Sequence, residues 1–234
     1  MKAVILAGGK GRRLEPYTTL LPKPLMPVGE YPVVEILIRQ LKRSGFTDLY
    51  FAVGHLAGLI EAYFQGGKKW GVRIQYSMEE EPLGTVGPLA LLRKELQSEP
   101  FLVVNGDILT DLDFSKVMDA HVASGAVLTL AVTHREVSVD FGVLELEGNK
   151  VTGFQEKPVL RYPVSMGIYA MSPRVFAFIP EGKKFDLPDL VWTLLRAREP
   201  VQAFLYEGFW LDIGREEDWR RAQEEFEKRR EAIL

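Results

Sequence analysis

The strongest constraint on the fold of this chain is an apolar segment that runs directly into a glycine-rich loop. Residues Ala3–Leu6 form a short apolar run, which is typical of a buried β-strand. Gly8, Gly9 and Gly11 follow almost at once. Because glycine has no side chain, these positions let the backbone turn sharply and point bare N–H groups at an anion. The sequence therefore predicts an anion-binding loop directly after the first strand.

Positive charge accompanies this loop. Arg12 and Arg13 follow the last glycine, and Lys23 stands between two prolines that stiffen the chain. The sequence lacks two known phosphate-binding motifs. No Gly-x4-Gly-Lys-Ser/Thr run occurs, and Leu14 stands where a dinucleotide-binding loop needs its third glycine. The competing interpretation is a flexible, solvated basic turn, and the fixed order of glycines, arginines and prolines disfavours it.

Length and composition limit the class of protein. The 234 residues suffice for one large domain or two small ones, and a net charge of −3 argues against a nucleic-acid-binding surface. The absence of cysteine excludes disulfides, thiolate metal sites and cysteine nucleophiles. No apolar run approaches the roughly 20 residues that span a bilayer, and the first one ends at Ala7, too early for a signal peptide. We therefore expect a cytoplasmic protein that binds neither nucleic acid nor membrane.

The hydrophobic pattern of the first half alternates between strands and helices. Strands are predicted at Ala3–Leu6, Leu49–Val53, Val72–Tyr76 and Phe101–Val104, and helices at Pro32–Ser44, Leu59–Phe64 and Val86–Leu96. This βαβ rhythm is typical of a mostly parallel sheet with helices on both faces.

The second half is richer in strands. Strands are predicted at Val127–Val132, Gly142–Leu146, Lys150–Phe154 and Val164–Ala170, and helices at Leu187–Arg198 and Glu216–Ala232. Glu147-Gly148-Asn149 is expected to form a hairpin turn. No linker, low-complexity tract or repeat divides the chain. We therefore predict a single mixed α/β domain over residues 1–234.

The stretch from Leu6 to Pro27, LAGGKGRRLEPYTTLLPKPLMP, resembles the signature of the sugar-1-phosphate nucleotidylyltransferases. Members of this family condense a nucleoside triphosphate with a sugar 1-phosphate to give a nucleoside-diphosphate sugar and pyrophosphate. The resemblance implies this reaction, Mg²⁺ as cofactor, and a Rossmann-like, glycosyltransferase-A-like fold with a mostly parallel sheet between helices. It also implies a nucleotide-binding half at about 1–110 and a sugar-binding half at about 111–234.

Many relatives continue into a left-handed β-helix of hexapeptide repeats, and no such repeats follow here. We expect any assembly or regulation carried by that extension to be absent. A monomer and a homo-oligomer both remain open.

The resemblance assigns roles to the residues of the loop. The reaction brings two polyanions together, so catalysis depends on positioning and on charge neutralisation. By resemblance Arg13 lies over the triphosphate and stabilises charge in the transition state, and Lys23 neutralises the phosphates. Arg12 occupies a more variable position and assists nucleotide binding. The remaining nucleotide contacts are assigned to Leu6, Ala7, Gly8, Gly9 and Gly11.

Two aspartates are candidate metal ligands. Asp107 ends the apolar run Leu102–Asn105 after one glycine, and the carboxyl end of a parallel strand is where open α/β sheets place ligands. Asp212 lies in the apolar segment Gly208–Gly214. By resemblance both aspartates ligate one Mg²⁺, with phosphate oxygens and water completing the shell. The competing interpretations are a turn-forming aspartate at 107 and a helix N-cap at 212.

The segment Glu79–Thr85 is expected to bind the base. By resemblance Gly84 and Thr85 approach the base and ribose, and Glu79 aligns with a glutamine of pyrimidine-specific relatives. A carboxylate offers only acceptors, whereas guanine presents adjacent N1–H and N2–H donors, which favours GTP. The string from Glu79 to Leu91 resembles mannose-1-phosphate guanylyltransferases, although uridylyl relatives with a similar Glu-Pro-Leu exist. Three consecutive glutamates are otherwise typical of a solvated acidic loop.

The sugar phosphate is assigned to residues of the second half and to Asn105. By resemblance Glu156 accepts sugar hydroxyls, Lys157 holds the sugar phosphate, and Gly142 belongs to the preceding sugar-side loop. Ser165 stands where the family usually has asparagine, so the identity of the sugar stays open. The histidines show no metal-ligand spacing. Trp192, Trp210 and Trp219 are expected in the core.

Three functions are compatible with these residues. The first is synthesis of an NDP-sugar, with GTP and mannose 1-phosphate as the favoured substrates. The second keeps the chemistry but uses UTP, dTTP or CTP with another sugar phosphate or phosphocholine. The third is an inactive regulatory subunit that binds an NDP-sugar, which the presence of Arg13, Lys23, Asp107 and Asp212 disfavours.

Overall fold

A seven-stranded sheet forms the centre of the molecule. The computed structural model describes all residues, Met1–Leu234. In spatial order the strands are β12 (Val201–Leu205), β8 (Leu128–Ser138), β11 (Val159–Met171), β6 (Phe101–Asn105), β1 (Lys2–Ala7), β4 (Asp48–Val53) and β5 (Arg73–Met78). Strand β1 pairs in parallel with β4 and β6, β4 with β5, and β12 with β8. Only β11 runs antiparallel to its neighbours β6 and β8. The predicted mixed, mostly parallel sheet is confirmed.

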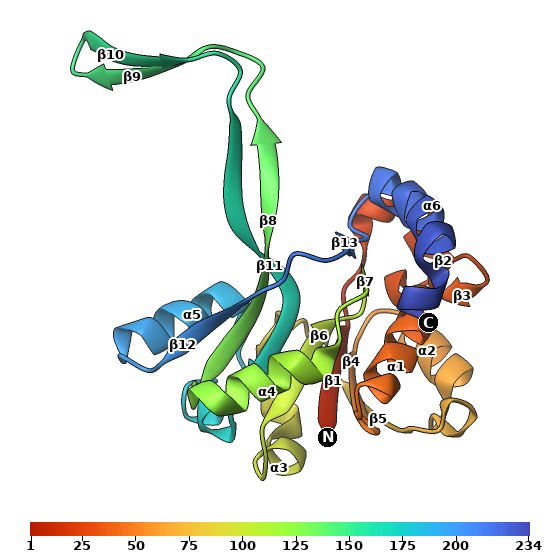
Figure 1. The fold of residues 1–234 in the computed structure, drawn as a ribbon. Coiled ribbons are helices and arrows are strands. Elements are labelled where there is room, and N and C mark those ends of the chain that lie inside the picture. The colour runs from red at the N-terminus through yellow and green to blue at the C-terminus, as the bar shows by residue number, and fades with distance from the viewer.

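Helices cover both faces of this sheet (Figure 1). Side chains of β1 alternate between the two faces, because successive residues of a strand point in opposite directions. Ala3 and Ile5 pack in one core with α1 (Val33–Arg43), α2 (Ala57–Phe64) and α4 (Phe114–Ser124). Val4 packs in the other core with α3 (Arg93–Leu96), α5 (Leu187–Arg196) and the 3₁₀ helix Gly87–Leu92. The sheet is therefore buried on both sides, as the apolar strands predict.

A third apolar cluster joins the C-terminal helix to the loops beside the sheet. Helix α6 (Glu216–Ile233) buries Ala222, Phe226 and Ile233 against α1 and the neighbouring loops. Two short pairs lie here, β7 (Ile108–Thr110) with β13 (Trp210–Asp212) and β2 (Pro27–Val28) with β3 (Tyr31–Pro32). The remaining 3₁₀ turns are Arg12–Leu14, Tyr17–Thr19, Lys23–Leu25, Lys68–Trp70 and Pro173–Ala177.

A β-arm projects from the body. Strands β8 and β11 run beyond the sheet as a two-stranded stem, and the stem bends into the hairpin of β9 (Val143–Glu147) and β10 (Lys150–Gln155) (Figure 1). The hairpin turn lies at residues 148–149, where Gly148 has φ +60°. This is the turn that the sequence predicts.

Most predicted elements are present with shifts of a few residues at their ends. Helix α4 and strands β2, β3, β7, β12 and β13 lack a predicted counterpart. The prediction for Val86–Leu96 was partly wrong, because most of this segment is 3₁₀ helix. The core assignment of Trp192 was wrong, since this side chain is 61% exposed on α5. No helix has the length and apolar character needed to cross a bilayer.

Candidate active site

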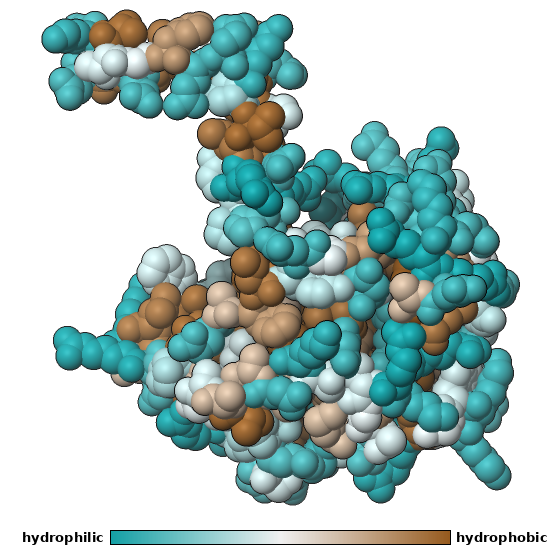
Figure 2. Space-filling model, in the orientation of Figure 1, coloured by the Kyte–Doolittle hydropathy of each residue, from teal (hydrophilic) through white to brown (hydrophobic).

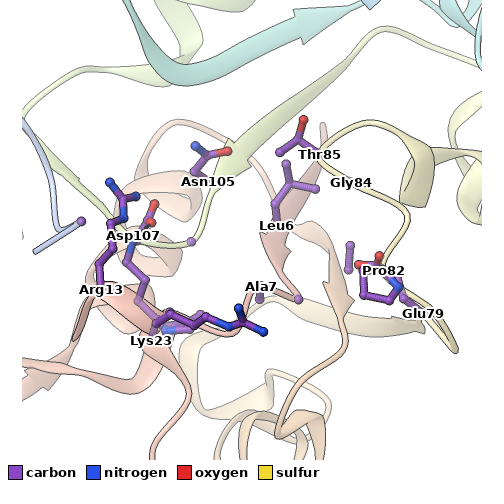
Figure 3. Close-up of a pocket in the computed structure, with 18 residues that line it drawn as sticks. Leu6, Ala7, Arg13, Lys23, Glu79, Pro82, Gly84, Thr85, Asn105 and Asp107 are labelled. Carbon is purple, nitrogen blue, oxygen red and sulfur yellow. Dashed lines mark hydrogen bonds and ion pairs between the residues drawn. The ribbon is translucent and has the colours of Figure 1, made fainter. Parts of the chain in front are cut away.

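A pocket of about 450 Å³ opens at the carboxyl ends of β1 and β6. It brings together thirteen of the residues that the sequence singles out for nucleotide, phosphate, sugar or metal binding. They are Leu6, Ala7, Gly8, Gly9, Gly11, Arg12, Arg13, Lys23, Glu79, Gly84, Thr85, Asn105 and Asp107. Pro24, Ala52, Pro82, Gly106 and Gly214 complete the lining without having been singled out. Figure 3 shows Arg13, Lys23 and Asp107 on one side of the pocket and Glu79, Pro82 and Gly84 on the other.

The glycine loop is shaped by close approaches that exclude side chains. A Cβ at Gly8 would lie 2.6 Å from Glu79 Oε1. Gly11 adopts the left-handed conformation with φ +62°, and a Cβ there would lie 2.9 Å from Thr18 Cγ2. Thr18 Oγ1 also donates a 2.9 Å hydrogen bond to the Gly11 carbonyl. Glycine is therefore favoured at position 11 by its backbone conformation, whereas a side chain at position 8 would displace the Glu79 carboxylate.

Lys23 and the two aspartates form one charged cluster. Asp107 follows β6, and Asp212 lies in β13, where it pairs with Ile108 of β7. This pairing brings the two carboxylates together from distant parts of the chain. Lys23 Nζ forms an ion pair with Asp107 and lies 3.8 Å from Asp212 Oδ1. The N-cap interpretation of Asp212 was wrong, because Arg215 occupies the N-cap of α6.

The carboxylate pair fits a divalent cation that also binds phosphate. Asp107 Oδ1 and Asp212 Oδ1 are buried and have no hydrogen-bond partner. Burial, followed by the charge of Asp107, raises the pKa of Asp212, while Lys23 and Arg13 oppose this shift. Nowhere in the structure do three His, Cys, Asp or Glu side chains form a group that could hold a metal ion. A cation that keeps several water or phosphate ligands, as Mg²⁺ does, needs only one or two carboxylates.

Glu79 is the one glutamate of its run of three that lines the pocket. Its side chain is half-buried, whereas Glu80 and Glu81 are exposed. Burial raises the pKa of Glu79, and a 2.8 Å hydrogen bond from the Leu83 N–H partly offsets this shift. Oε2 of Glu79 thus accepts a hydrogen bond within its own loop, and Oε1 lies against Gly8.

The loop of Gly84 and Thr85 is tied to the start of α5. The Thr85 N–H donates a 2.9 Å hydrogen bond to Asp186 Oδ1, and Thr85 Oγ1 accepts one of 2.9 Å from the Leu187 N–H. Gly84 has φ +83°, and a Cβ there would lie 2.5 Å from Asp186 Oδ1. Asp186 also caps α5 in a reciprocal pair with Asp189. Capping is a signal for a helix start and not for a ligand, so Asp186 was missed as a residue of the site.

A second pocket of about 430 Å³ adjoins the first and shares Thr85 and Asn105 with it. Ser165 and Asp212 line it as well. A Cβ at Gly167 would lie 2.5 Å from Asn105 Nδ2, so the glycine leaves room for that amide. The other lining residues were not predicted to belong to a site, and Trp210 was expected in the core; they are Ile108, Met166, Gly167, Tyr169, Asp186, Leu187, Pro188 and Trp210. We call this space the sugar-side pocket.

Three predicted sugar-phosphate residues lie elsewhere. Gly142, Glu156 and Lys157 belong to the bend between the stem and the hairpin, and neither pocket includes them. They do lie near each other, since a Cβ at Gly142 would be 3.4 Å from Glu156 Oε2. The structure therefore does not unite these residues with Ser165 and Asn105 of the same chain.

Comparison with known proteins identifies the family. A family model described as nucleotidyl transferase matches residues 2–229. The chain belongs to this family, as the motif resemblance predicts. It is 36% identical, over 95% of its length, to a UTP–glucose-1-phosphate uridylyltransferase of Synechocystis sp.. It is 34% identical, over 94% of its length, to mannose-1-phosphate guanyltransferases of Candida albicans and Xenopus laevis. The chain spans 62% of the length of each of these relatives.

Solved structures of other proteins share the fold of this chain. A candidate glucose-1-phosphate thymidylyltransferase from Bacillus anthracis, solved in complex with a sucrose, superposes with a TM-score of 0.77 at 27% identity. The match covers 96% of this chain and 94% of that one. HddC from Yersinia pseudotuberculosis, complexed with GMP-PN, superposes with a TM-score of 0.76 at 24% identity, covering 96% and 99%.

Proposed function

We propose that this chain transfers a nucleotidyl group from a nucleoside triphosphate to a sugar 1-phosphate and releases pyrophosphate. The observation that carries the proposal is the charged cluster beside the glycine loop. Arg13 and Lys23 lie with Asp107 at one side of a pocket that Gly8, Gly9 and Gly11 also line. Such a site suits a triphosphate, because a reaction between two anions is limited by charge repulsion and by positioning.

The reaction assigned to the site is attack by a phosphate oxygen of the sugar 1-phosphate on the α-phosphorus. The bond from the α-phosphorus to the bridging oxygen breaks, and pyrophosphate leaves with the electron pair. Arg13 and Lys23 stabilise the charge that develops on the phosphates. Asp107 and Asp212 would hold Mg²⁺, which supplies further neutralisation of the phosphate oxygens when bound. The glycine loop allows the phosphates to approach the backbone N–H groups.

Guanylyl transfer to mannose 1-phosphate is the specificity we favour. Glu79 faces the pocket from the side opposite the charged cluster, and its carboxylate accepts hydrogen bonds only. Guanine offers two adjacent donors to such a group. Relatives named mannose-1-phosphate guanyltransferases support this choice. The uridylyltransferase relative at 36% identity supports UTP as the second candidate.

A pyrophosphate-release assay tests the proposal. The common nucleoside triphosphates are each combined with a panel of sugar 1-phosphates in the presence of Mg²⁺. We expect pyrophosphate release, fastest with GTP and mannose 1-phosphate. Binding of an NDP-sugar without turnover of any pair would overturn the catalytic proposal and support a regulatory subunit. The division into a nucleotide-binding half, about 1–110, and a sugar-binding half, about 111–234, belongs to the same proposal.

A further inference from the structure

The loop that carries Glu79, Gly84 and Thr85 lies outside every helix and strand. It covers residues 79–86, between β5 and the 3₁₀ helix that begins at Gly87, and we call it the base loop. At its start the Glu79 N–H donates a 3.0 Å hydrogen bond to the Val53 carbonyl of β4. The end of the loop is held from a different direction, by residues about 100 positions later in the chain.

Residues 185–187 hold the end of the base loop, and we call them the anchor segment. The Phe185 N–H donates a 2.9 Å hydrogen bond to the Leu83 carbonyl, and the Val86 N–H donates one of 3.0 Å to the Phe185 carbonyl. A Cβ at Gly87 would lie 2.9 Å from the Lys183 carbonyl oxygen. The two parts of the chain are therefore in direct backbone contact.

Asp186 supplies the side-chain contact between them. Its Oδ1 accepts a 2.9 Å hydrogen bond from the Thr85 N–H and lies against Gly84, where there is no room for a Cβ. The competing interpretation is that Asp186 only begins helix α5. That role accounts for the 3.0 Å hydrogen bond from the Asp186 N–H to Asp189 Oδ2. It does not account for the bond to Thr85, because a helix cap needs no partner outside the helix.

The anchor segment is fixed by the core behind it. Phe185 and Leu187 pack against the apolar cluster that contains Leu190 and Leu194 of α5, and both of these leucines are fully buried. Figure 2 shows apolar side chains also at the surface on the flank of the body where α5 lies. Residues 80–82 of the base loop, in contrast, are exposed. The base loop therefore depends on the anchor segment for its position, and not the reverse.

Leu83 connects the anchor segment to the proposed base contact. Its carbonyl accepts the hydrogen bond from the Phe185 N–H, and its own N–H donates a 2.8 Å hydrogen bond to Glu79 Oε2. A shift of the loop away from the anchor segment would therefore move the donor that orients the Glu79 carboxylate.

The anchor segment also forms part of the sugar-side pocket. Asp186, Leu187 and Pro188 line this pocket together with Thr85, and Thr85 lines the nucleotide pocket as well. A molecule in the sugar-side pocket thus contacts the residues that hold the base loop. A ligand shifts a conformational equilibrium by as much as it favours one state over the other. A ligand that fits the pocket with the loop in place therefore stabilises the loop in that position.

We propose that Asp186 is a positioning residue that fixes the base loop and couples the sugar-side pocket to the nucleotide pocket. It acts through Thr85 and need not touch either ligand. The coupling is reciprocal, because the factor by which one ligand raises the affinity of the other is the same in both directions. The role of the base loop in holding a nucleotide rests on the proposed function. The nucleotide site then depends on residues beyond the half at about 1–110.

Three variants separate the contact with Thr85 from the start of helix α5. Asp186→Ser keeps a good N-cap residue, but its side chain is one bond shorter and loses the contact with Thr85. Asp186→Asn keeps an acceptor oxygen in the same place and is the conservative variant. Asp189→Ala weakens the same helix start and leaves the base loop untouched. Asp186→Thr, with another N-cap residue, replaces the serine variant if circular dichroism shows that this variant does not fold.

The first experiment measures hydrogen exchange of the base loop in the protein without ligand. The Thr85 amide is expected to exchange about 10-fold faster in Asp186→Ser, the scale of one lost hydrogen bond to a charged group. Asp186→Asn and Asp189→Ala are expected to stay near the wild-type rate. An unchanged rate in Asp186→Ser overturns the proposal, and so does an equal acceleration in Asp189→Ala, which would mean that only the helix start matters.

The second experiment measures the coupling by calorimetry. The probes are mannose 1-phosphate and the α,β-methylene analogue of GTP, whose bridge between the α- and β-phosphorus cannot be cleaved. In the wild type each probe is expected to raise the affinity of the other by about 10-fold. Asp186→Ser is expected to bind the analogue about 10-fold more weakly and to lose the coupling, whereas Asp186→Asn and Asp189→Ala retain it. A wild type without coupling overturns the proposal, as does Asp186→Ser with wild-type coupling.

The two experiments separate the role of Asp186 from the proposed function. A wild type that binds neither the GTP analogue nor the corresponding UTP analogue contradicts the proposed function, and the exchange of the Thr85 amide still decides whether Asp186 holds the loop. Binding and turnover together with unchanged exchange in Asp186→Ser contradict the role of Asp186 and leave the proposed function standing.

Discussion

Lys23 and Asp107 form an ion pair at one side of the pocket, although 84 positions separate them in the chain. The same ammonium lies 3.8 Å from Asp212 Oδ1. Lys23 thus balances two carboxylates that would otherwise repel each other. If Asp107 and Asp212 held a divalent cation, Lys23 would be released to neutralise the phosphates of a triphosphate. The cluster is therefore the first target for substitution.

The proposed metal ligands, Asp107 and Asp212, are tested by neutral, nearly isosteric substitutions. Asp107→Asn and Asp212→Asn are each expected to abolish most turnover, because each removes charge from the cation site. EDTA is expected to have the same effect on the wild-type enzyme. Circular dichroism provides the control for folding. Undiminished activity in EDTA, without contaminating metal, would contradict the metal assignment.

The proposed role of Arg13 and Lys23 in neutralising the phosphates, here called the phosphate clamp, is tested by alanine substitutions with the neighbouring Arg12 for comparison. Arg13→Ala and Lys23→Ala are expected to lower kcat by about 10²-fold or more, the scale of losing one preorganised donor in the transition state. Arg12→Ala is the matched control and is expected to cost distinctly less. Steady-state kinetics measures all three variants. A larger loss for Arg12→Ala than for Arg13→Ala would mean that the clamp belongs to the other side chain.

The base contact is tested by removing one donor from the nucleotide. ITP lacks the exocyclic amine of GTP, so kcat/KM is expected to favour GTP by about 10-fold to 10²-fold if Glu79 accepts both guanine donors. Glu79→Gln is expected to reduce this preference, because an amide also presents a donor. Glu80→Gln is the control from the exposed part of the same run. Faster turnover of UTP or dTTP than of GTP with every sugar phosphate would refute the guanylyl specificity.

Gly84→Ala is expected to lower stability as well as nucleotide binding. The new Cβ would lie 2.5 Å from Asp186 Oδ1 and 2.8 Å from the Phe185 carbonyl, at φ +83°. Strain of this kind costs about 1–3 kcal/mol. Gly58→Ala is the control, since its Cβ meets nothing within 4 Å in helix α2. Thermal unfolding of both variants checks the difference, and equal melting temperatures would contradict it.

The buried His121 makes stability depend on pH. Its Nδ1 lies 2.8 Å from Thr129 Oγ1, its Nε2 has no partner, and burial lowers its pKa from 6.5. The unfolded chain then binds a proton more readily than the folded one. Above about pH 6.5 the imidazole is neutral in both states, and its contribution to the free energy of unfolding is fully present. As the pH falls below 6.5 the free energy of unfolding decreases, by up to about 1.4 kcal/mol per pH unit.

His121→Gln removes the titrating group and keeps a partner for Thr129. Denaturant unfolding at pH 7.5 and pH 5 is expected to show a smaller loss of unfolding free energy for the variant than for the wild type. Equal losses would mean that His121 does not titrate in this range.

The sequence predicts those helices and strands whose hydrophobic pattern lies within the element itself. The apolar run before the glycine loop and the helical spacing of Val33, Ile36, Leu37 and Leu41 both give the observed β1 and α1. Short strands such as β7 and β13 carry only three residues each, so no periodicity reveals them. Trp192 illustrates a different failure, because its apolar side chain suggests burial whichever face of α5 it occupies.

The sequence by itself determined the family, the order of the central strands β1, β4, β5 and β6 and of helices α1 and α2, and the identity of the charged side chains. These follow from motifs and periodicities within a few residues of each other. Only the tertiary structure decided which charges meet. The pairing of β7 with β13 brings Asp212 to Asp107, and the paired stretch of β11 from Val159 to Ser165 separates Lys157 from Ser165. The reason is that strand pairing joins residues far apart in the chain, and the local pattern of one strand does not identify the strand with which it pairs.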